Sequence, residues 1–276
     1  MSEKELNLEN CRKIHMTTIN NKPVFYVEWK HKNEGTKTIP SLIKSYSLEN
    51  NWNKFIIPGT TVIDIGAHTG DTMIPAALLC STILCVEPNP FVREILEINC
   101  ELNKHLCNII VAEELVTNVD TDSIVLYDHD NDMCNGGILD KTLSEHTQNI
   151  INQCAKNSVV CKGLTLESMC KKYLTDVETS NISFIKIDTE GHDKEIIRSS
   201  KDFLNKYKPN LFIEWFAFYG DEDNIDLFKV IEDINYVAFN PTNLEKASIN
   251  HRIWDLILIH KDKINGNIMF ENVIFR

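Results

Sequence analysis

The stretch that decides the fold is residues 61–72, which read Thr61-Val62-Ile63-Asp64-Ile65-Gly66-Ala67-His68-Thr69-Gly70-Asp71-Thr72. An apolar run stops at an acid, passes through two glycines and enters a segment with helical spacing. A second apolar run, residues 83–86, ends in Glu87. Glu87 lies about 20 residues beyond the first acid, the distance expected for a ribose-binding carboxylate in a nucleotide fold. Together the two runs predict a crevice for an adenosine-containing cofactor.

Strand-like and helix-like segments alternate along most of the chain. This alternation predicts an α/β fold, with a mostly parallel sheet and helices on both of its faces. The strands are apolar at consecutive positions, as expected for strands that are buried on both sides. The expected strands cover residues 62–65, 83–86, 109–112, 184–187, 211–213, 236–239 and 254–259, and the expected helices cover residues 72–79, 90–103, 193–207 and 225–234.

Two segments lie outside this alternation. Residues 1–54 are expected to form an N-terminal extension, with a strand at 23–29 and a helix at 39–55, ahead of a cofactor-binding domain at 55–276. Residues 123–164 are polar and contain strand-like pieces at 124–127 and 159–161. Because long loops in compact domains are usually functional or disordered, we expect residues 123–164 to form an insertion or lid beside the site.

Composition narrows the class of protein. The 276 residues carry a formal net charge of −12, which repels phosphate backbones and disfavours nucleic acid as a partner. The nine cysteines include no CxxC pair, and most are expected to be reduced, structural thiols; Cys134, beside residues 135–137, is the one near the predicted site. No apolar stretch reaches membrane-spanning length, and the N-terminus lacks the apolar core of a signal peptide. The sequence therefore predicts a soluble, cytoplasmic protein with no membrane partner.

The glycine turn is the predicted cofactor site. Glycines let the backbone approach a ligand closely, and amides that open a helix bind negative groups. His68 stands where dinucleotide folds usually have a middle glycine. This disfavours NAD or FAD and favours the smaller carboxylate end of S-adenosylmethionine; a plain strand–helix turn is the alternative. The predicted cofactor-binding residues are Asp64, Gly66, Ala67, His68, Thr69, Gly70, Asp71, Thr72, Glu87 and Asn89.

Acidic residues follow two later strands. Asp188, Glu190 and His192 come directly after residues 184–187, where a carboxylate or imidazole can take a proton from a substrate hydroxyl. We predict these three residues to be catalytic. Glu214 ends the next strand and, with Asn135 and Gly136, is predicted to bind the substrate. Asp188, Glu190 and Glu214 are also the kind of oxygen donor that magnesium uses. Acids at strand ends are common in this fold, so no metal site is predicted.

These motifs resemble the FkbM family of S-adenosylmethionine-dependent methyltransferases. The resemblance is carried by residues 62–72, Glu87-Pro88, residues 135–137 and 164–167, and above all Ile185-Lys186-Ile187-Asp188-Thr189-Glu190-Gly191. It implies a class I methyltransferase (Rossmann-like) fold, with a seven-stranded sheet whose last strand, here residues 254–259, runs antiparallel. It also implies O-methylation, commonly of sugars or other hydroxylated metabolites. His192 departs from the family, which often has an apolar or aromatic residue there.

The favoured function is S-adenosylmethionine-dependent O-methylation of a small hydroxylated molecule such as a sugar, nucleotide-sugar or glycan. A nicotinamide-dependent oxidoreductase on the same layout is one alternative. A non-catalytic protein that keeps the cofactor pocket and acts as a partner or scaffold is another. The expected partners are a sugar-like small molecule and a second copy of the chain.

Overall fold

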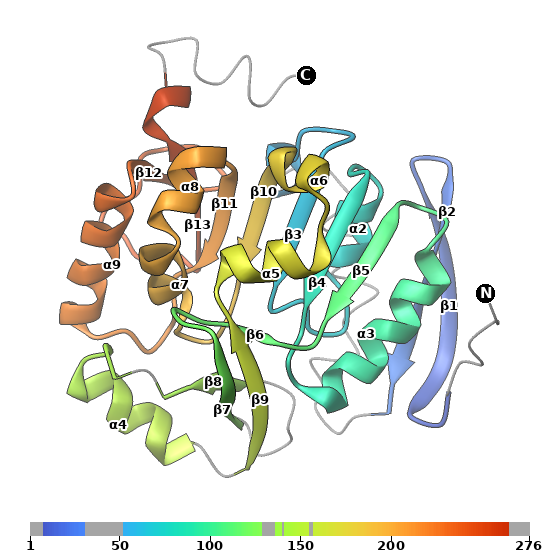
Figure 1. Ribbon diagram of the computed structural model, residues 1–276, viewed down its shortest axis with the longest axis horizontal. Coiled ribbons are helices and arrows are strands. Elements are labelled where there is room, and N and C mark those ends of the chain that lie inside the picture. The colour runs from blue at the N-terminus through green and yellow to red at the C-terminus, as the bar shows by residue number, and fades with distance from the viewer. Residues whose placement is uncertain (1–7, 31–51, 129–135, 140, 155–156, 265–276) are drawn as a thin grey trace.

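A seven-stranded sheet forms the centre of the computed structural model, which describes residues 8–30, 52–128, 136–139, 141–154 and 157–264 (Figure 1). The strand order is β12-β13-β11-β10-β3-β4-β5. β13 runs antiparallel to both of its neighbours, while β11, β10, β3, β4 and β5 are parallel. The strands are β3 (Thr61–Ile65), β4 (Thr82–Val86), β5 (Asn108–Ala112), β10 (Ile182–Ile187), β11 (Asn210–Glu214), β12 (Tyr236–Phe239) and β13 (Asp255–His260). The seven predicted strands and the class I methyltransferase arrangement are confirmed.

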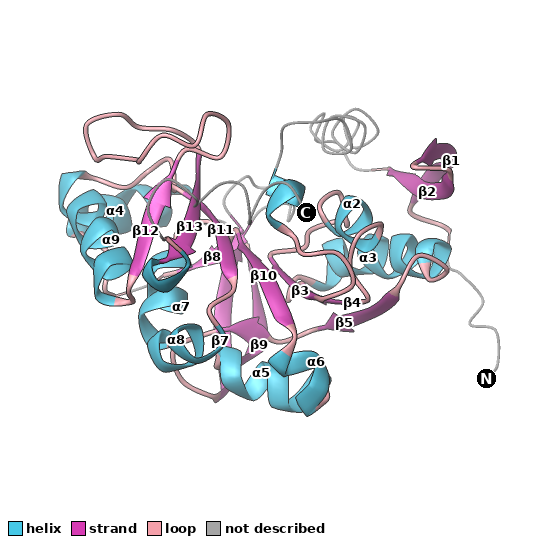
Figure 2. Cartoon of the chain, turned by 90° about the horizontal axis from the view of Figure 1, so that it is seen from above, coloured by secondary structure: helices cyan, strands magenta, loops and turns pink. Residues whose placement is uncertain are grey.

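Helices cover both faces of this sheet, because the strands have apolar side chains on both faces. Ile63 and Ile65 pack into one core cluster, whereas Val62 packs into the other. Figure 2 shows α2 and α3 on one face and α5 to α9 on the other. The helices are α2 (Met73–Ala77), α3 (Pro90–Asn103), α5 (Leu166–Tyr173), α6 (Asp176–Ser180), α7 (Asp193–Ser199), α8 (Lys201–Tyr207) and α9 (Asp221–Asp233).

Three of the helices differ from the expected ones in where they begin or end. The predicted helix at 193–207 is two helices, α7 and α8, which meet at Ser200. The predicted helix at 72–79 is shorter, and α9 begins earlier than expected, with three acids in its first turn. Acids near a helix N-terminus are stabilised by the helix dipole. Of the predicted helix at 39–55, residues 39–51 lie outside the described residues, and Trp52–Phe55 form a 3-10 helix.

A small second sheet lies beside the carboxyl ends of the central strands (Figure 1). Its strands are β6 (Leu115–Val116), β7 (Thr121–Asp128), β8 (Gly136–Ile138) and β9 (Ser158–Leu164), and α4 (Glu145–Cys154) follows β8. The predicted strand-like pieces at 124–127 and 159–161 lie within β7 and β9. Asp223 of α9 ties α4 to the main fold, since it accepts hydrogen bonds from the Ser144 amide, the Thr147 hydroxyl and the Lys194 ammonium.

An N-terminal hairpin, β1 (Cys11–Ile19) and β2 (Lys22–Trp29), packs against α3. Its β2 strand matches the expected strand, but β1 was not predicted. Asn99 and Asn103 accept hydrogen bonds from the backbone amides of Val27 and Phe25 at 2.9 and 3.0 Å. Two asparagines one helical turn apart thereby satisfy backbone groups of β2 that would otherwise lack partners.

None of the helices within the described ranges has the length and apolar character needed to span a bilayer.

Gly66 provides a test of how tightly β3 and β10 meet. Its φ is +76°, and a Cβ at this position would lie 1.8 Å from the Asp188 carbonyl oxygen. Gly59 has a similar φ of +78° with nothing within 4 Å of the same point. We expect Gly59→Ala to reduce the free energy of unfolding by about 1–2 kcal/mol through backbone strain alone. Gly66→Ala should cost about 1–3 kcal/mol more, because of the backbone collision.

Urea unfolding of the two variants and the wild type measures this difference. Equal losses in the two variants would mean that the close approach of β10 to Gly66 is not a constraint on the fold.

Candidate functional site

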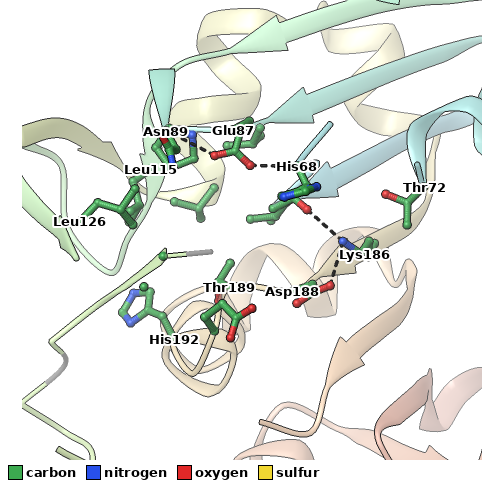
Figure 3. Close-up of a pocket in the computed structure, with 18 of the residues that line it drawn as sticks. His68, Thr72, Glu87, Asn89, Leu115, Leu126, Lys186, Asp188, Thr189 and His192 are labelled. Carbon is green, nitrogen blue, oxygen red and sulfur yellow. Dashed lines mark hydrogen bonds and ion pairs between the residues drawn. The ribbon is translucent and has the colours of Figure 1, made fainter. Parts of the chain in front are cut away.

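A cavity of about 270 Å³ opens where β3, β4 and β10 end (Figure 3). The chain runs from β3 outward through β4 to β5, and then returns to β10 on the other side of β3. Open α/β sheets bind ligands at such a switch in strand order, beyond the carboxyl ends of the strands. The predicted site residues that line the cavity are Gly66, His68, Asp71, Thr72, Glu87, Asn89, Gly136, Asp188, Glu190 and His192.

Five other predicted site residues do not line the cavity: Asp64, Ala67, Thr69, Gly70 and Glu214. Asn135 lies outside the described residues. Gly70 illustrates the difference. A Cβ there would lie 3.0 Å from Met73 and 3.1 Å from Leu96, so this glycine permits close packing between the turn and the helices. Its amide donates to the Ala67 carbonyl at 2.9 Å and is therefore used inside the turn, whereas the sequence predicted that it would bind a negative group.

Glu87 is joined to the glycine turn by a hydrogen bond. Its Oε2 accepts from the His68 amide at 3.0 Å, and its Oε1 accepts from the Asn89 amide at 2.9 Å. Arg93 donates to the backbone carbonyls of Glu87 and Pro88, which holds the chain after β4 in place. Burial raises the pKa of Glu87 to about 7, and the two amide hydrogen bonds oppose that rise. The two halves of the predicted cofactor site therefore lie together in one cavity.

The glycine turn is also supported from behind by the hairpin and α3. Asn99 donates to the Thr69 carbonyl at 2.7 Å while it accepts from the Val27 amide. The Trp29 ring packs edge-on against the His68 ring, with 6.4 Å between the ring centroids. His68 has a φ of +48°, an uncommon conformation for a side-chain-bearing residue. These contacts hold the turn in that conformation.

Lys186 lies at the floor of the cavity, between β3 and β10. Its ammonium is 3.6 Å from an Asp64 oxygen and 3.2 Å from an Asp188 oxygen, and it donates to the Gly66 carbonyl at 3.0 Å. Burial acts to lower the pKa of Lys186, but Asp188, Asp64 and Asp71 together raise it above its ordinary value. Asp64 is buried too and also accepts a hydrogen bond from the Thr72 hydroxyl at 2.6 Å. Lys186 is therefore a charged group that links the ends of two strands.

Three carboxylates form a row across the sheet edge. Ile187 pairs with Ile213, so Asp188 and Glu214 follow at neighbouring positions on β10 and β11. Glu214 pairs in turn with Asp255 of β13. Burial and then the Asp188 charge raise the pKa of Glu214 to about 10 and that of Asp255 to about 6. Glu214 therefore carries a proton at neutral pH, while the Asp188 side chain is 44% exposed toward the cavity.

The loop that carries the predicted catalytic residues is held rigidly. Gly191 has a φ of +105°, and a Cβ there would lie 2.9 Å from the Phe216 ring. The Tyr219 hydroxyl donates to the Gly191 carbonyl at 2.8 Å. Asp193 accepts from the Thr189 hydroxyl and the Gly191 amide. Glu190, with a φ of +56°, thereby faces the cavity.

His192 lines the cavity but is largely buried, at 4% exposure, and occupies the N-cap position of α7. Figure 3 shows its ring on the side of the cavity away from Lys186. Its role as a proton acceptor stays a prediction.

Sequence reasoning missed several residues that line the cavity. Lys186 is a lone lysine inside an otherwise apolar strand, a signal that a buried charge must find a partner. Asp255 begins β13, whereas the acids that the sequence marks as site residues stand at or after the ends of strands. Because β13 is antiparallel, its first residue lies at the same edge as the last residues of the parallel strands. The apolar part of the lining comes from Val86, Pro88, Leu115, Val116, Leu126 and Ile138, which no periodicity in the sequence marks.

The cavity thus has an apolar part and an acidic part. The apolar residues suit a flat ring system, and Glu87 lies beside them. Asp71, Glu87, Asp188, Glu190 and Asp255 outnumber the single lysine in the lining, which favours a ligand with positive charge. Within the described part of the chain, no group of three or more His, Cys, Asp or Glu side chains is arranged to hold a metal ion.

Comparison with protein families identifies the domain. A family model described as the methyltransferase FkbM domain matches residues 64–239. This range covers the glycine turn, Glu87 and the whole of the Asp188–Asp193 loop. A search of curated proteins found no match.

Solved structures with a similar fold include an FkbM methyltransferase from Methylobacillus flagellatus KT, with 14% identity and a TM-score of 0.44. The match covers 82% of this chain and 54% of that chain, so this chain spans about half the length of that protein. A precorrin-6y C5,15-methyltransferase from Geobacter metallireducens GS-15 has 12% identity, coverage of 81% and 87%, and a TM-score of 0.39. A Streptococcus mutans protein solved in complex with SAH has 10% identity, coverage of 83% and 98%, and a TM-score of 0.40.

Replacement of Lys186 tests whether the buried ion pair stabilises the fold. Lys186→Met leaves Asp64 buried without its cationic partner, and we expect a loss of about 3–5 kcal/mol in the free energy of unfolding. The double variant Lys186→Met/Asp64→Asn should recover part of that loss, because no buried charge then remains. Chemical denaturation measures both.

Lys171→Met is the matched control, since Lys171 and its partner Glu167 are 73% and 63% exposed. Its loss should stay below about 0.5 kcal/mol. A Lys186→Met variant as stable as Lys171→Met would refute a structural role for the buried lysine.

Proposed function

The chain belongs to the FkbM methyltransferase family, and from this premise we propose that it transfers the methyl group of S-adenosylmethionine to a hydroxyl group of a small molecule. The observation that carries the proposal is that Glu87 and Asp188, at the ends of two different strands, line one cavity. Figure 3 shows Glu87 and Asp188 on two sides of this cavity, and we assign Glu87 to the cofactor and Asp188 to the substrate.

The donor set of the cavity fits this cofactor. Each Glu87 oxygen accepts one backbone hydrogen bond and keeps capacity for a second, which suits the two hydroxyls of a ribose. The apolar residues beside Glu87, among them Leu115, Leu126 and Ile138, suit an adenine ring. The acidic remainder of the lining suits the positive charges of a sulfonium and an amino group.

Asp188 is the residue best placed to act on the acceptor. When bound, the cofactor supplies an electrophilic methyl carbon with a good leaving group. An alcohol is a weak nucleophile, so a positioned carboxylate that accepts its proton aids the reaction. Lys186 holds Asp188 at 3.2 Å and fixes the direction of its oxygens. Burial and then the Asp188 charge raise the pKa of the neighbouring Glu214 to about 10, so Glu214 is protonated at neutral pH and cannot accept that proton.

The acceptor that we propose is a sugar or a similar hydroxylated metabolite, as the family resemblance implies. β7 and β8 contribute Leu126 and Gly136 to the lining, so the insertion takes part in forming the space available to an acceptor. The net charge of −12 supports a small molecule over a nucleic acid. We further propose that the protein acts in the cytoplasm, and that a homodimer is its assembly.

Two other functions were considered from the sequence. A nicotinamide dinucleotide carries an anionic pyrophosphate, which the acidic lining of the cavity would repel, so the structure favours S-adenosylmethionine. A non-catalytic protein that only binds the cofactor would keep the cavity but show no transfer to any acceptor.

Cofactor choice and the role of Glu87 are tested together by ligand-induced stabilisation. S-adenosylhomocysteine at 100 times its dissociation constant should stabilise the protein by about 2.7 kcal/mol, and NAD at the same concentration should not. Because ribose hydroxyls donate to the ionised carboxylate, binding should tighten as pH rises from about 6 to 8, through the raised pKa of about 7. The limit is about tenfold per pH unit below that pKa.

Glu87→Gln should bind more weakly and lose this pH dependence, which calorimetric titration at several pH values would measure. Stabilisation by NAD, or an unchanged pH dependence in Glu87→Gln, would contradict the proposed cofactor site.

Loss of the proposed base should stop the reaction and spare the cofactor. Asp188→Asn should lower turnover by about 100-fold or more while affinity for S-adenosylhomocysteine changes little. The assay incubates the protein with labelled S-adenosylmethionine and a panel of sugars, nucleotide-sugars and glycans, and detects the gain of a methyl group by mass spectrometry.

Asp202→Asn, on the exposed surface of α8, is the matched control and should keep full activity. Undiminished turnover in Asp188→Asn would remove Asp188 from the mechanism. A wild-type protein that binds the cofactor but methylates nothing in the panel would favour the non-catalytic alternative.

A further inference from the structure

Two cysteines lie side by side at the edge of the sheet opposite the cavity. Cys80 precedes β4 and Cys107 precedes β5, and these strands pair with Thr82 opposite Asn108. The Cys80 thiol donates to the Cys107 sulfur, with 3.8 Å between the two sulfur atoms. The two thiols are therefore neighbours in space although α3 separates them in the chain.

The two thiols differ in their surroundings in a way that assigns them different roles. Of the seven cysteines that the structure describes, Cys107 is the one that is not buried, whereas Cys80 is 7% exposed. The hydrogen bond from Cys80 lowers the pKa of Cys107, and the nearby Lys22 ammonium of the hairpin lowers it further, while burial acts against both. A reagent in solvent therefore reaches Cys107, the more acidic thiol, before it reaches the buried thiol of Cys80.

From this arrangement we propose that Cys80 and Cys107 form a dithiol that a hydroperoxide converts to a disulfide. The proposal is independent of methyl transfer. It also revises, for these two cysteines, the expectation of reduced, structural thiols.

The chemistry proceeds in two steps. The Cys107 thiolate attacks one oxygen of the hydroperoxide, the O–O bond breaks, and the other oxygen leaves as hydroxide or alkoxide and takes up a proton. Cys107 is then a sulfenic acid. The Cys80 sulfur attacks the Cys107 sulfur, the S–O bond breaks, and the hydroxyl leaves as water with the Cys80 proton. The two sulfurs lose two electrons, and the hydroperoxide gains them.

The backbone geometry permits this bond. The Asn108 amide donates to the Ser81 carbonyl at 3.0 Å, one residue away from each cysteine. In the register of β4 and β5, Cys107 lies opposite Ser81, one residue from Cys80. With strands about 4.8 Å apart and a rise of about 3.3 Å per residue, this diagonal pair has a Cα separation of about 6 Å, within the range of about 4.4–6.8 Å that disulfides need.

The disulfide would close a loop that contains β4 and α3, and the bond itself would lie far from the cavity. β4 begins beside Cys80 and ends just before Glu87, so the bond and the cavity lie at opposite ends of the same strand. We expect oxidation to raise the melting temperature by roughly 5 °C or more, since a disulfide restricts the unfolded chain. Affinity for S-adenosylhomocysteine should be unchanged.

The test treats the reduced full-length protein with hydrogen peroxide, blocks the remaining thiols with N-ethylmaleimide, and maps the peptides by mass spectrometry. The expected product is one cross-linked pair of peptides, Cys80 with Cys107, that has lost two hydrogen atoms and is restored by dithiothreitol. Cys80→Ser should stop at a Cys107 sulfenic acid that dimedone traps. Cys107→Ser should leave Cys80 unmodified.

Cys170→Ser is the control, since Cys170 is buried at 1% exposure within the other core cluster, and it should form the cross-link like the wild type. The circular dichroism spectrum of each variant confirms that it is folded. Cross-linking of Cys107 to any other cysteine would overturn the proposal. So would oxidation of other thiols ahead of Cys107, or peroxide treatment that yields no Cys80–Cys107 bond.

Discussion

A single buried ammonium group organises the centre of this molecule. Lys186 lies between Asp64 and Asp188, and it also donates to the Gly66 carbonyl. These contacts join β3 to β10 at the switch in strand order, where a crevice forms between two diverging connections. A buried cation is tolerated only with partners that satisfy it. The requirement to satisfy Lys186 therefore sets the relative positions of the glycine turn and the Asp188–Asp193 loop.

The carboxyl groups around Lys186 differ in pKa and therefore in charge. Burial raises the pKa values of Glu87, Glu214 and Asp255, and the charge of Asp188 raises those of Glu214 and Asp255 further. Asp64 and Asp188 form ion pairs with Lys186, whereas Glu214, the next acid along the sheet edge, holds a proton at neutral pH.

The sequence predicted the sheet well, because each strand is a short apolar run bounded by polar residues, and burial on both faces makes such runs easy to recognise. The sequence also predicted that Glu87 lies beside the glycine turn, because the spacing between the two along the chain is typical of a nucleotide-binding fold. The features that the sequence did not predict depend on contacts between segments that lie far apart in the chain, or on elements too short to show a pattern. Asp255 reaches the site only through the reversed direction of β13. The break between α7 and α8 and the short strands β6 and β8 carry too few residues for a periodic pattern. Gly70, by contrast, carried a visible pattern but serves helix packing and not the cavity.

The hairpin contacts have a consequence for where the chain can be shortened. Asn99 bonds both to Val27 of the hairpin and to Thr69 of the glycine turn, and Val92, Ile95 and Ile98 of α3 pack against Cys11, Val27 and Trp29. A truncated protein that started at Phe55 would expose this apolar face of α3 to water and remove the partner that orients the Asn99 amide. The hairpin within the N-terminal extension is thus part of the scaffold beneath the turn, and deletion of the hairpin would damage the cavity although the hairpin does not line it.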